Sequence, residues 1–161
     1  MRQEPQGQNA SVNRWLWMIP LVYLAHMAEE IWGGEGYVAY TERMHGVHID
    51  PQRLLLLDGL AIALLVVGVL LARRFGFQKW MLLILGTLAL INGIRHTITT
   101  ITTAAYNPGV VTGLAIFIPF GVLVLVRMKR VMRNAEYLAA LSIGVGIQVG
   151  VTILALRGGK I

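Results

Sequence analysis

The chain has 161 residues, of which 56% are hydrophobic and only 14% are charged. A soluble domain averages about 25% charged residues, so this composition excludes an ordinary water-facing surface and favours a lipid-facing one. The net charge of +6 would suit a nucleic-acid partner. We exclude that partner because the basic residues lie in short runs between apolar segments, the positive-inside pattern of membrane proteins. The lack of cysteine excludes disulfides and thiolate metal sites.

Residues 1–13 are polar, and we expect them to form a disordered cytoplasmic tail. The first apolar run, residues 14–32, has a short uncharged core, so the hydrophobic region of a signal peptide is an alternative interpretation. Cleavage after Ala28 would place His26 where a small residue is expected, which disfavours that alternative. We therefore interpret this run as the first membrane span.

The polar segment 33–53 predicts a loop that contains a short interfacial helix around residues 37–44. Four further apolar runs follow it, each close to the ~20 residues that a bilayer core requires. These predicted spans are residues 54–72, 80–104, 110–126 and 137–156. The sequence therefore predicts an all-α polytopic transmembrane helix bundle with about five spans, in which residues 14–161 form a single domain.

The distribution of Lys and Arg predicts the orientation of the spans. With five spans and a cytoplasmic amino terminus, the inside set is Arg2, Arg14, Arg73, Arg74, Lys79, Arg127, Lys129, Arg130 and Arg133. The outside set is Arg43, Arg53, Arg157 and Lys160. Because the inside set is the larger, we expect a multi-pass protein of the cell membrane whose amino terminus is cytoplasmic.

Several polar residues inside the spans share one depth. A helix rises 1.5 Å per residue, which places His26 roughly 18 Å and Glu30 roughly 24 Å above the inner end of the first span. Asn92 and His96 lie roughly 18 Å and 24 Å above the inner end of the third. Asp58 lies near the same layer, four residues into the second span. The polar groups therefore meet in the outer half of the membrane.

The angular positions agree with the depths. At about 100° per residue, one face of the first span and one face of the third are polar. The first face is formed by Tyr23, His26, Glu29 and Glu30, and the second by Asn92, Arg95, His96 and Thr99. A charged residue at the centre of a span costs about 2.5–3.5 kcal/mol, and adjacent carboxylates need a cation or a proton. Arg95, a bound metal or a proton could neutralise them, and imidazole with carboxylate suits zinc, iron or manganese.

The residues His26-Met27-Ala28-Glu29-Glu30 read H-x-x-E-E, and Tyr106-Asn107-Pro108-Gly109 read Y-x-P-G. Together with His96, in a chain of this size and hydropathy, they resemble the HXXEE-domain family of small integral membrane proteins, over roughly residues 15–126. The resemblance implies several membrane helices and a shared polar site at His26, Glu29, Glu30 and His96, but no reaction.

We expect a membrane-embedded enzyme that acts on a lipid or another apolar small molecule at this His/Glu site near the outer face. In the metal-dependent form, the ligands of a divalent Zn, Fe or Mn ion would be His26, Glu29, Glu30 and His96. The candidate catalytic residues are Glu29, Glu30, Asn92 and Arg95. The neighbouring candidates are Tyr23, Asp58 and Tyr106.

Three alternatives stay open at the sequence level. A metal-free isomerase or cyclase would use one proton shared by the paired glutamates. A proton-coupled transporter would also contain intramembrane His and Glu, although polar groups in a single layer do not form a pathway. A structural membrane subunit is favoured by Gly144, Gly146 and Gly150 on the fifth span, which indicate a close-packing face for a partner chain, for example in a homo-oligomer.

Overall fold

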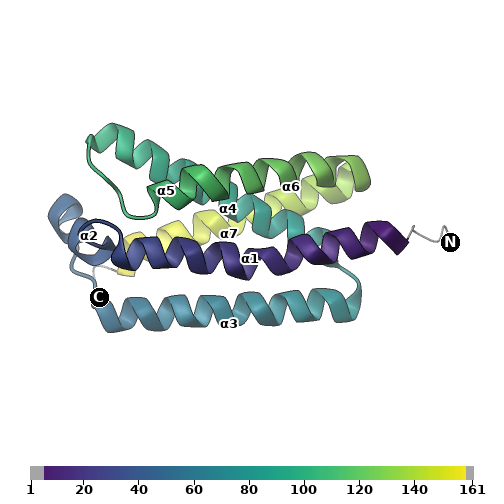
Figure 1. The fold of residues 1–161 in the computed structure, drawn as a ribbon, viewed down its shortest axis with the longest axis horizontal. Coiled ribbons are helices and arrows are strands. Elements are labelled where there is room, and N and C mark those ends of the chain that lie inside the picture. Colours follow the sequence, from purple (N-terminus) through teal and green to yellow (C-terminus); the bar gives the residue numbers. More distant parts are fainter. Residues whose placement is uncertain (1–5, 159–161) are drawn as a thin grey trace.

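The computed structural model describes residues 6–158, and every regular element in that range is helical (Figure 1). The elements are α1 (Gln6–Trp32), α2 (Tyr37–His45), α3 (Pro51–Phe75), α4 (Gln78–Thr103), α5 (Val110–Thr112), the π-helix η1 (Gly113–Phe117), α6 (Ile118–Val131) and α7 (Asn134–Gly158). Helix α2 coincides with the short helix expected in the polar loop. Arg2 and Lys160, used in predicting the orientation, lie outside the described residues.

Four described segments are long and apolar enough to cross a membrane: α3, α4, the continuous segment Val110–Val131, and Asn134–Ile153 of α7. Helix α1 has 27 residues and runs beside α3 along the length of the bundle (Figure 1). The chain is therefore a multi-pass membrane protein, an all-α bundle of roughly five spans. Its first helix begins at Gln6, so residues 6–13, expected to be disordered, are helical, and residues 1–5 of the predicted tail lie outside the described range.

Local signals in the sequence account for the ends of α3. Asp50 caps its amino terminus by accepting a hydrogen bond from the Gln52 N–H, and Pro51, which has no N–H to leave unpaired, occupies the first turn. At the other end Gly76 adopts a left-handed conformation with φ 82°, and its N–H bonds the Ala72 carbonyl. The chain then turns directly into α4, so the two helices are antiparallel neighbours.

Helix α4 is the centre of the bundle, because it packs against α1, α3, α6 and α7. Small residues bring it close to the fourth span: a side chain at Gly86 would meet Val124, and one at Gly93 would meet the Gly113 carbonyl oxygen at 2.7 Å. The largest buried apolar side chains of this core include Leu16, Leu82, Leu83, Val124 and Met128. Helix α3 lies at the edge, where it packs against α1 and α4.

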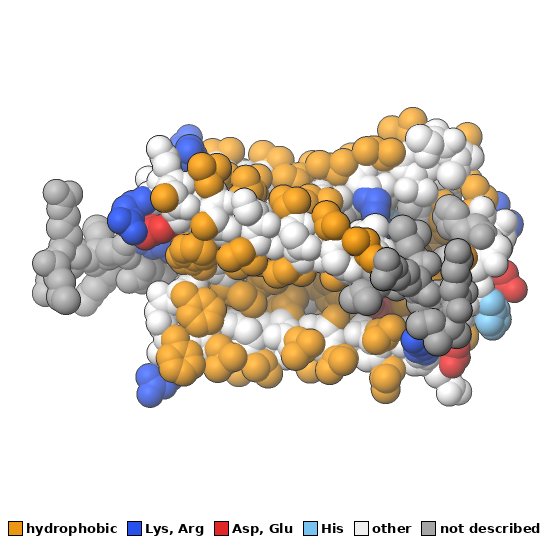
Figure 2. All heavy atoms as spheres, turned by 180° about the vertical axis from the view of Figure 1, so that it is seen from behind, with side chains coloured by type: hydrophobic (Ala, Val, Ile, Leu, Met, Phe, Trp, Pro, Cys, Tyr) orange, Lys and Arg blue, Asp and Glu red, His pale blue; other side chains and the backbone are white. Residues whose placement is uncertain are grey.

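The ends of the bundle differ from its middle. Hydrophobic side chains cover the middle of the face shown in Figure 2, and charged side chains gather mainly at its two ends. Helix α2 and the turn between α4 and α5 lie at one end, and the α3–α4 and α6–α7 turns lie at the other, with the start of α1 (Figure 1). The molecule thus has the surface of a membrane protein, with one end that carries the H-x-x-E-E motif.

Candidate metal centre

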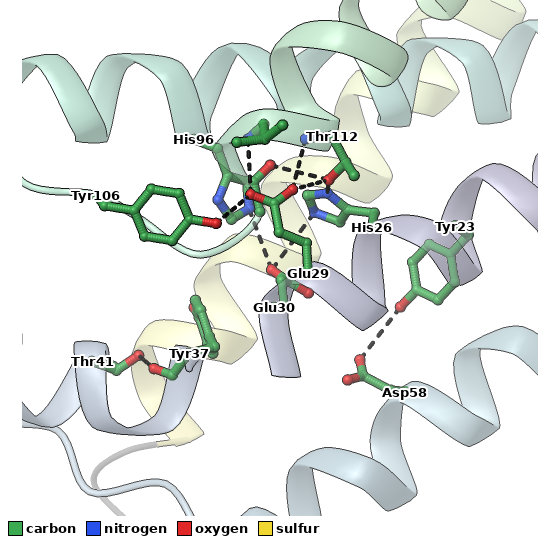
Figure 3. A network of polar contacts seen from close by, with 12 residues as sticks. Tyr23, His26, Glu29, Glu30, Tyr37, Thr41, Asp58, His96, Tyr106 and Thr112 are labelled. Atoms are coloured by element: carbon green, nitrogen blue, oxygen red, sulfur yellow. Dashed lines mark hydrogen bonds and ion pairs between the residues drawn. The ribbon is translucent and has the colours of Figure 1, made fainter. Parts of the chain in front are cut away.

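Three of the predicted site residues converge between α1 and α4. His26 and Glu30 lie one turn apart on α1, and His96 faces them from α4 (Figure 3). The Glu30 Oε1 atom lies 3.6 Å from His26 Nε2 and 3.3 Å from His96 Nε2. Both imidazole side chains are 1% exposed, whereas Glu30 is 18% exposed. Glu30 is therefore the member of the group that reaches the surface of the protein.

The spacing of these atoms suits a metal ion. Among the described residues, these three form the group of His, Asp or Glu whose ligand atoms all lie within 4.8 Å of one another. Ligands bound tetrahedrally at about 2.0–2.2 Å from an ion are roughly 3.3–3.6 Å apart, and the two separations from Glu30 Oε1 fall in that range. Neither Nε2 atom has a hydrogen-bond partner in the described part of the chain. A buried polar atom without a partner is costly, and a shared ion would satisfy all three groups.

Thr112 determines which nitrogen of His26 carries the proton. Its hydroxyl has one hydrogen, which it donates to the acceptor-only Glu29 Oε2 at 2.5 Å. The His26 Nδ1 atom, 2.8 Å from the same hydroxyl oxygen, must therefore be the donor in that bond. The lone pair of Nε2 then points towards Glu30 and His96. Histidine ligands of metals are commonly oriented in this way, through the nitrogen that does not bind the ion.

Glu29 lies beside this group, but both of its carboxylate oxygens accept hydrogen bonds from other residues. Its Oε1 accepts hydrogen bonds from the Tyr106 hydroxyl at 2.7 Å and the Val111 N–H at 2.9 Å. Its Oε2 accepts from the N–H of Thr112 at 2.6 Å as well as from the hydroxyl. These N–H groups begin a helix and have no intrahelical partner, so a carboxylate is favourable there. Glu29 was predicted to be a metal ligand, but in the structure its carboxylate accepts four hydrogen bonds from the protein.

The backbone of the Y-x-P-G turn packs directly against the two histidines of the site. Gly109 has φ 97°, and a Cβ added to it would lie 2.8 Å from the Cε1 atoms of both His26 and His96. Any side chain at this position would therefore be strained and would displace both imidazoles. The glycine of one motif is needed so that the backbone can pass directly over the histidine of the other. The two motifs form one structural unit.

Tyr106 holds the same turn against the end of α1. A side chain at Gly33 would meet the Tyr106 hydroxyl at 2.7 Å, and one at Gly34 would meet its ring at 2.9 Å. Burial, together with the hydrogen bond to the Glu29 carboxylate, raises the pKa of Tyr106 to about 12. The hydroxyl consequently remains a hydrogen-bond donor at physiological pH.

The other predicted candidates lie outside the group of three. Arg95, a predicted candidate for neutralising the carboxylates, forms no ion pair with Glu29 or Glu30 among the described residues. It lines a small cavity of about 60 Å³ beside His96, under α2, with Tyr37 and Thr99.

The remaining candidates make contacts of their own. Asn92 is half-buried, and its Oδ1 has no partner in the described range. The Tyr23 hydroxyl points to Asp58 at 3.4 Å, so these two residues pair with each other across α1 and α3 (Figure 3).

The site also contains residues that sequence reasoning missed. Thr112 bridges His26 and Glu29, and Phe117 in η1 packs against His26 with ring centroids 4.2 Å apart. The π-helical turn precedes Pro119, whose missing N–H and bulky ring are incompatible with a regular α-helix at this point. One signal was available: a helix that starts after Y-x-P-G exposes N–H groups near the depth of Glu29.

Comparison with known proteins identifies the family of this chain. The model of one family, described as "Protein of unknown function with HXXEE motif", matches residues 17–124. No curated protein matches the chain, and no solved structure matches it. The match covers more than half of the chain and includes His26, Glu29, Glu30, His96 and the Y-x-P-G turn, so the chain belongs to the HXXEE family.

Proposed function

We propose that this protein is a membrane-embedded, metal-dependent enzyme that acts on a lipid or another apolar molecule. The observation that carries the proposal is the convergence of two buried imidazole nitrogens without partners and one carboxylate oxygen, at separations suited to a shared ion. Two histidines with one carboxylate suit catalytic zinc or non-haem iron, and both kinds of site keep a coordination position open.

The surroundings of the group support catalysis rather than a purely structural ion. A structural zinc site is usually closed by four protein ligands, whereas three potential ligands converge here among the described residues. The open position would take water or a substrate oxygen, which the ion would polarise. Glu29, with four protein donors, would orient His26 through Thr112. Glu30, with its partly exposed carboxylate, would then be the one nearby glutamate able to reach the substrate as well as the ion.

The access and depth of the site support an apolar substrate. The group lies between helices that face lipid, near the end of the bundle that the Lys and Arg distribution predicts to be outside. Its exposed side is that of Glu30, so a molecule dissolved in the bilayer could present a polar atom there. We expect the amino terminus to be cytoplasmic and the site to open towards the outer leaflet.

Metal content tests the proposal directly. The protein would be purified in mild detergent without chelator and analysed by elemental mass spectrometry, beside His26→Ala/His96→Ala and a control, His48→Ala. His48 lies in the exposed loop, with its side chain 75% exposed, so the control removes a histidine without touching the site. We expect about one zinc, iron or manganese per wild-type and control chain, and none in the double variant.

Catalysis needs a second measurement. Metal-loaded protein and Glu30→Gln would each be incubated with membrane lipid extract, and the products would be compared by untargeted mass spectrometry. We expect a lipid species that the wild type consumes and that Glu30→Gln leaves unchanged. Metal binding without turnover would contradict the enzyme and leave a metal-binding protein. No metal in any variant would favour the metal-free isomerase, cyclase or carrier.

A further inference from the structure

A groove lies at the other end of the bundle from the candidate metal centre. It has a volume of about 410 Å³ and is lined by α1, the start of α4 and α6. Its lining combines three basic residues with apolar and aromatic side chains and contains no acidic residue among those described. The residues used below are Trp15, Lys79, Leu123, Val126, Arg127 and Arg130.

Contacts within the protein orient Arg127, one of the basic residues of the groove. The Arg127 guanidinium donates a hydrogen bond to the Ser11 hydroxyl at 2.6 Å and lies over the ring of Trp15, 5.7 Å from its centroid. These two contacts orient the guanidinium but leave further N–H donors, since arginine has five. Glu136, at the start of α7, pairs with Arg133 at 2.6 Å outside the groove and also interacts electrostatically with Lys79, so this one carboxylate is shared among several cations. The groove therefore presents a concentration of positive charge.

The apolar part extends from these cations towards the middle of the membrane. Leu123 lies seven residues before Arg130 on α6, which places it roughly 10 Å deeper along the helix. Leu123 and Val126 are exposed, at 55% and 48%, and so offer an open apolar surface below the charges. This polarity, with cations at the interface and an apolar wall beneath, is that of a phospholipid with an anionic head.

We infer that this groove is a specific binding site for an anionic phospholipid. Lys79, Arg127 and Arg130 would hold the phosphate, and an acyl chain would lie along Leu123 and Val126. Basic pockets between membrane helices on the cytoplasmic side bind anionic headgroups. The positive-inside orientation places this groove in the cytoplasmic leaflet, where anionic lipids are available. Its volume of about 410 Å³ is in the usual range for small-ligand sites.

The test is native mass spectrometry of the whole protein released from mixed micelles containing dioleoyl phosphatidylglycerol or dioleoyl phosphatidylcholine. The variant is Lys79→Gln/Arg130→Gln, which leaves the Arg127 contacts intact. The matched control is Arg73→Gln/Arg74→Gln, which removes the same charge at the same end but on α3, outside the groove. We expect wild type and control to retain phosphatidylglycerol and the groove variant to bind it roughly 30-fold more weakly.

Two further arms keep the result interpretable. Val126→Trp fills the groove with all charges present and should also lose the lipid, even if the charge variant fails to fold. Excess inorganic phosphate should not displace the lipid, because the acyl contacts are part of the site. Equal losses in the groove variant and the α3 control would overturn the proposal in favour of diffuse charge attraction. Equal retention of phosphatidylcholine, or displacement by phosphate alone, would also overturn it.

Discussion

At the scale of single residues, adjacent positions in the H-x-x-E-E motif have different tasks. Glu29 and Glu30 are consecutive, so their side chains point about 100° apart around α1. Glu30 turns towards the two histidines, and Glu29 turns towards the start of α5. The sequence predicted that both belong to one polar layer. The sequence could not show which of the two glutamates would find protein donors, because those donors come from residues 77 to 83 positions away.

Gly109 provides the sharpest prediction at this scale. Gly109→Ala adds one methyl group at φ 97°, directly against both imidazole rings. We expect a backbone strain of about 1–3 kcal/mol, with displacement of His26 and His96 and a loss of bound metal. The measurement is metal content together with thermal unfolding in detergent.

Gly46→Ala is the matched control for this change. Gly46 also has a positive φ, 63°, but nothing lies within 4 Å of its added Cβ. This variant should lose some stability and keep its metal. Full metal content in Gly109→Ala would contradict our account of why the two motifs occur together.

At the scale of elements, the structure shows how the start of the fourth span is stabilised. The Glu29 carboxylate on α1 takes the place of a local cap, because it accepts hydrogen bonds from the second and third N–H groups of α5, those of Val111 and Thr112. Because the cap comes from another helix, folding of this helix end and orientation of His26 are coupled. The Y-x-P-G residues Tyr106–Gly109 connect the two spans, since α4 ends at Thr103 and α5 begins at Val110.

Glu29→Gln should separate this capping role from metal binding. The amide removes the charge at the helix start and turns an N–H₂ group towards donors, so we expect the unfolding free energy to fall by about 1–3 kcal/mol. Metal affinity should fall about 10–100-fold, the usual effect of losing a group that orients a ligand. Glu30→Gln should instead keep most of the stability and lose the metal. Thermal unfolding and metal titration measure both effects, and identical behaviour of the two variants would contradict the division of roles.

Packing between elements was only partly predictable. The glycines of the fifth span predicted one close-packing face, but only one of the three packs against another helix in the described part of the chain. A side chain at Gly144 would meet Thr87 of α4 at 2.9 Å, whereas Gly146 and Gly150 have nothing within 4 Å of an added Cβ. Spacing along a helix predicts which residues share a face, but the position of the neighbouring helix determines how much of that face is covered.

At the scale of the whole molecule, the bundle has two chemically different ends. The candidate metal centre lies near α2 and the Y-x-P-G turn, and the basic groove lies at the α3–α4 and α6–α7 turns. The orientation predicted from Lys and Arg places the first outside and the second inside. Both proposals therefore depend on the same topology, which one experiment can establish.

The chain contains no cysteine, so single cysteines can report the topology without background. A membrane-impermeant maleimide applied to intact cells should label His48→Cys, in the loop before α3, and should not label Phe75→Cys, at the end of α3, until the cells are opened. Both positions lie at the surface of the protein. The reverse labelling pattern would place the metal centre inside and would refute the predicted orientation.

The sequence by itself determined the membrane class, the approximate helices, the polar layer and the family. These follow from local properties: hydropathy over about 20 residues, the rise of 1.5 Å per residue and short motifs. The tertiary structure decided which polar residues meet. His26, Glu30 and His96 converge, Glu29 caps α5, Tyr23 pairs with Asp58, and Arg95 lies beside a separate small cavity. The physical reason is that depth and angle on one helix do not give its rotation against another, which depends on contacts between residues distant in the sequence.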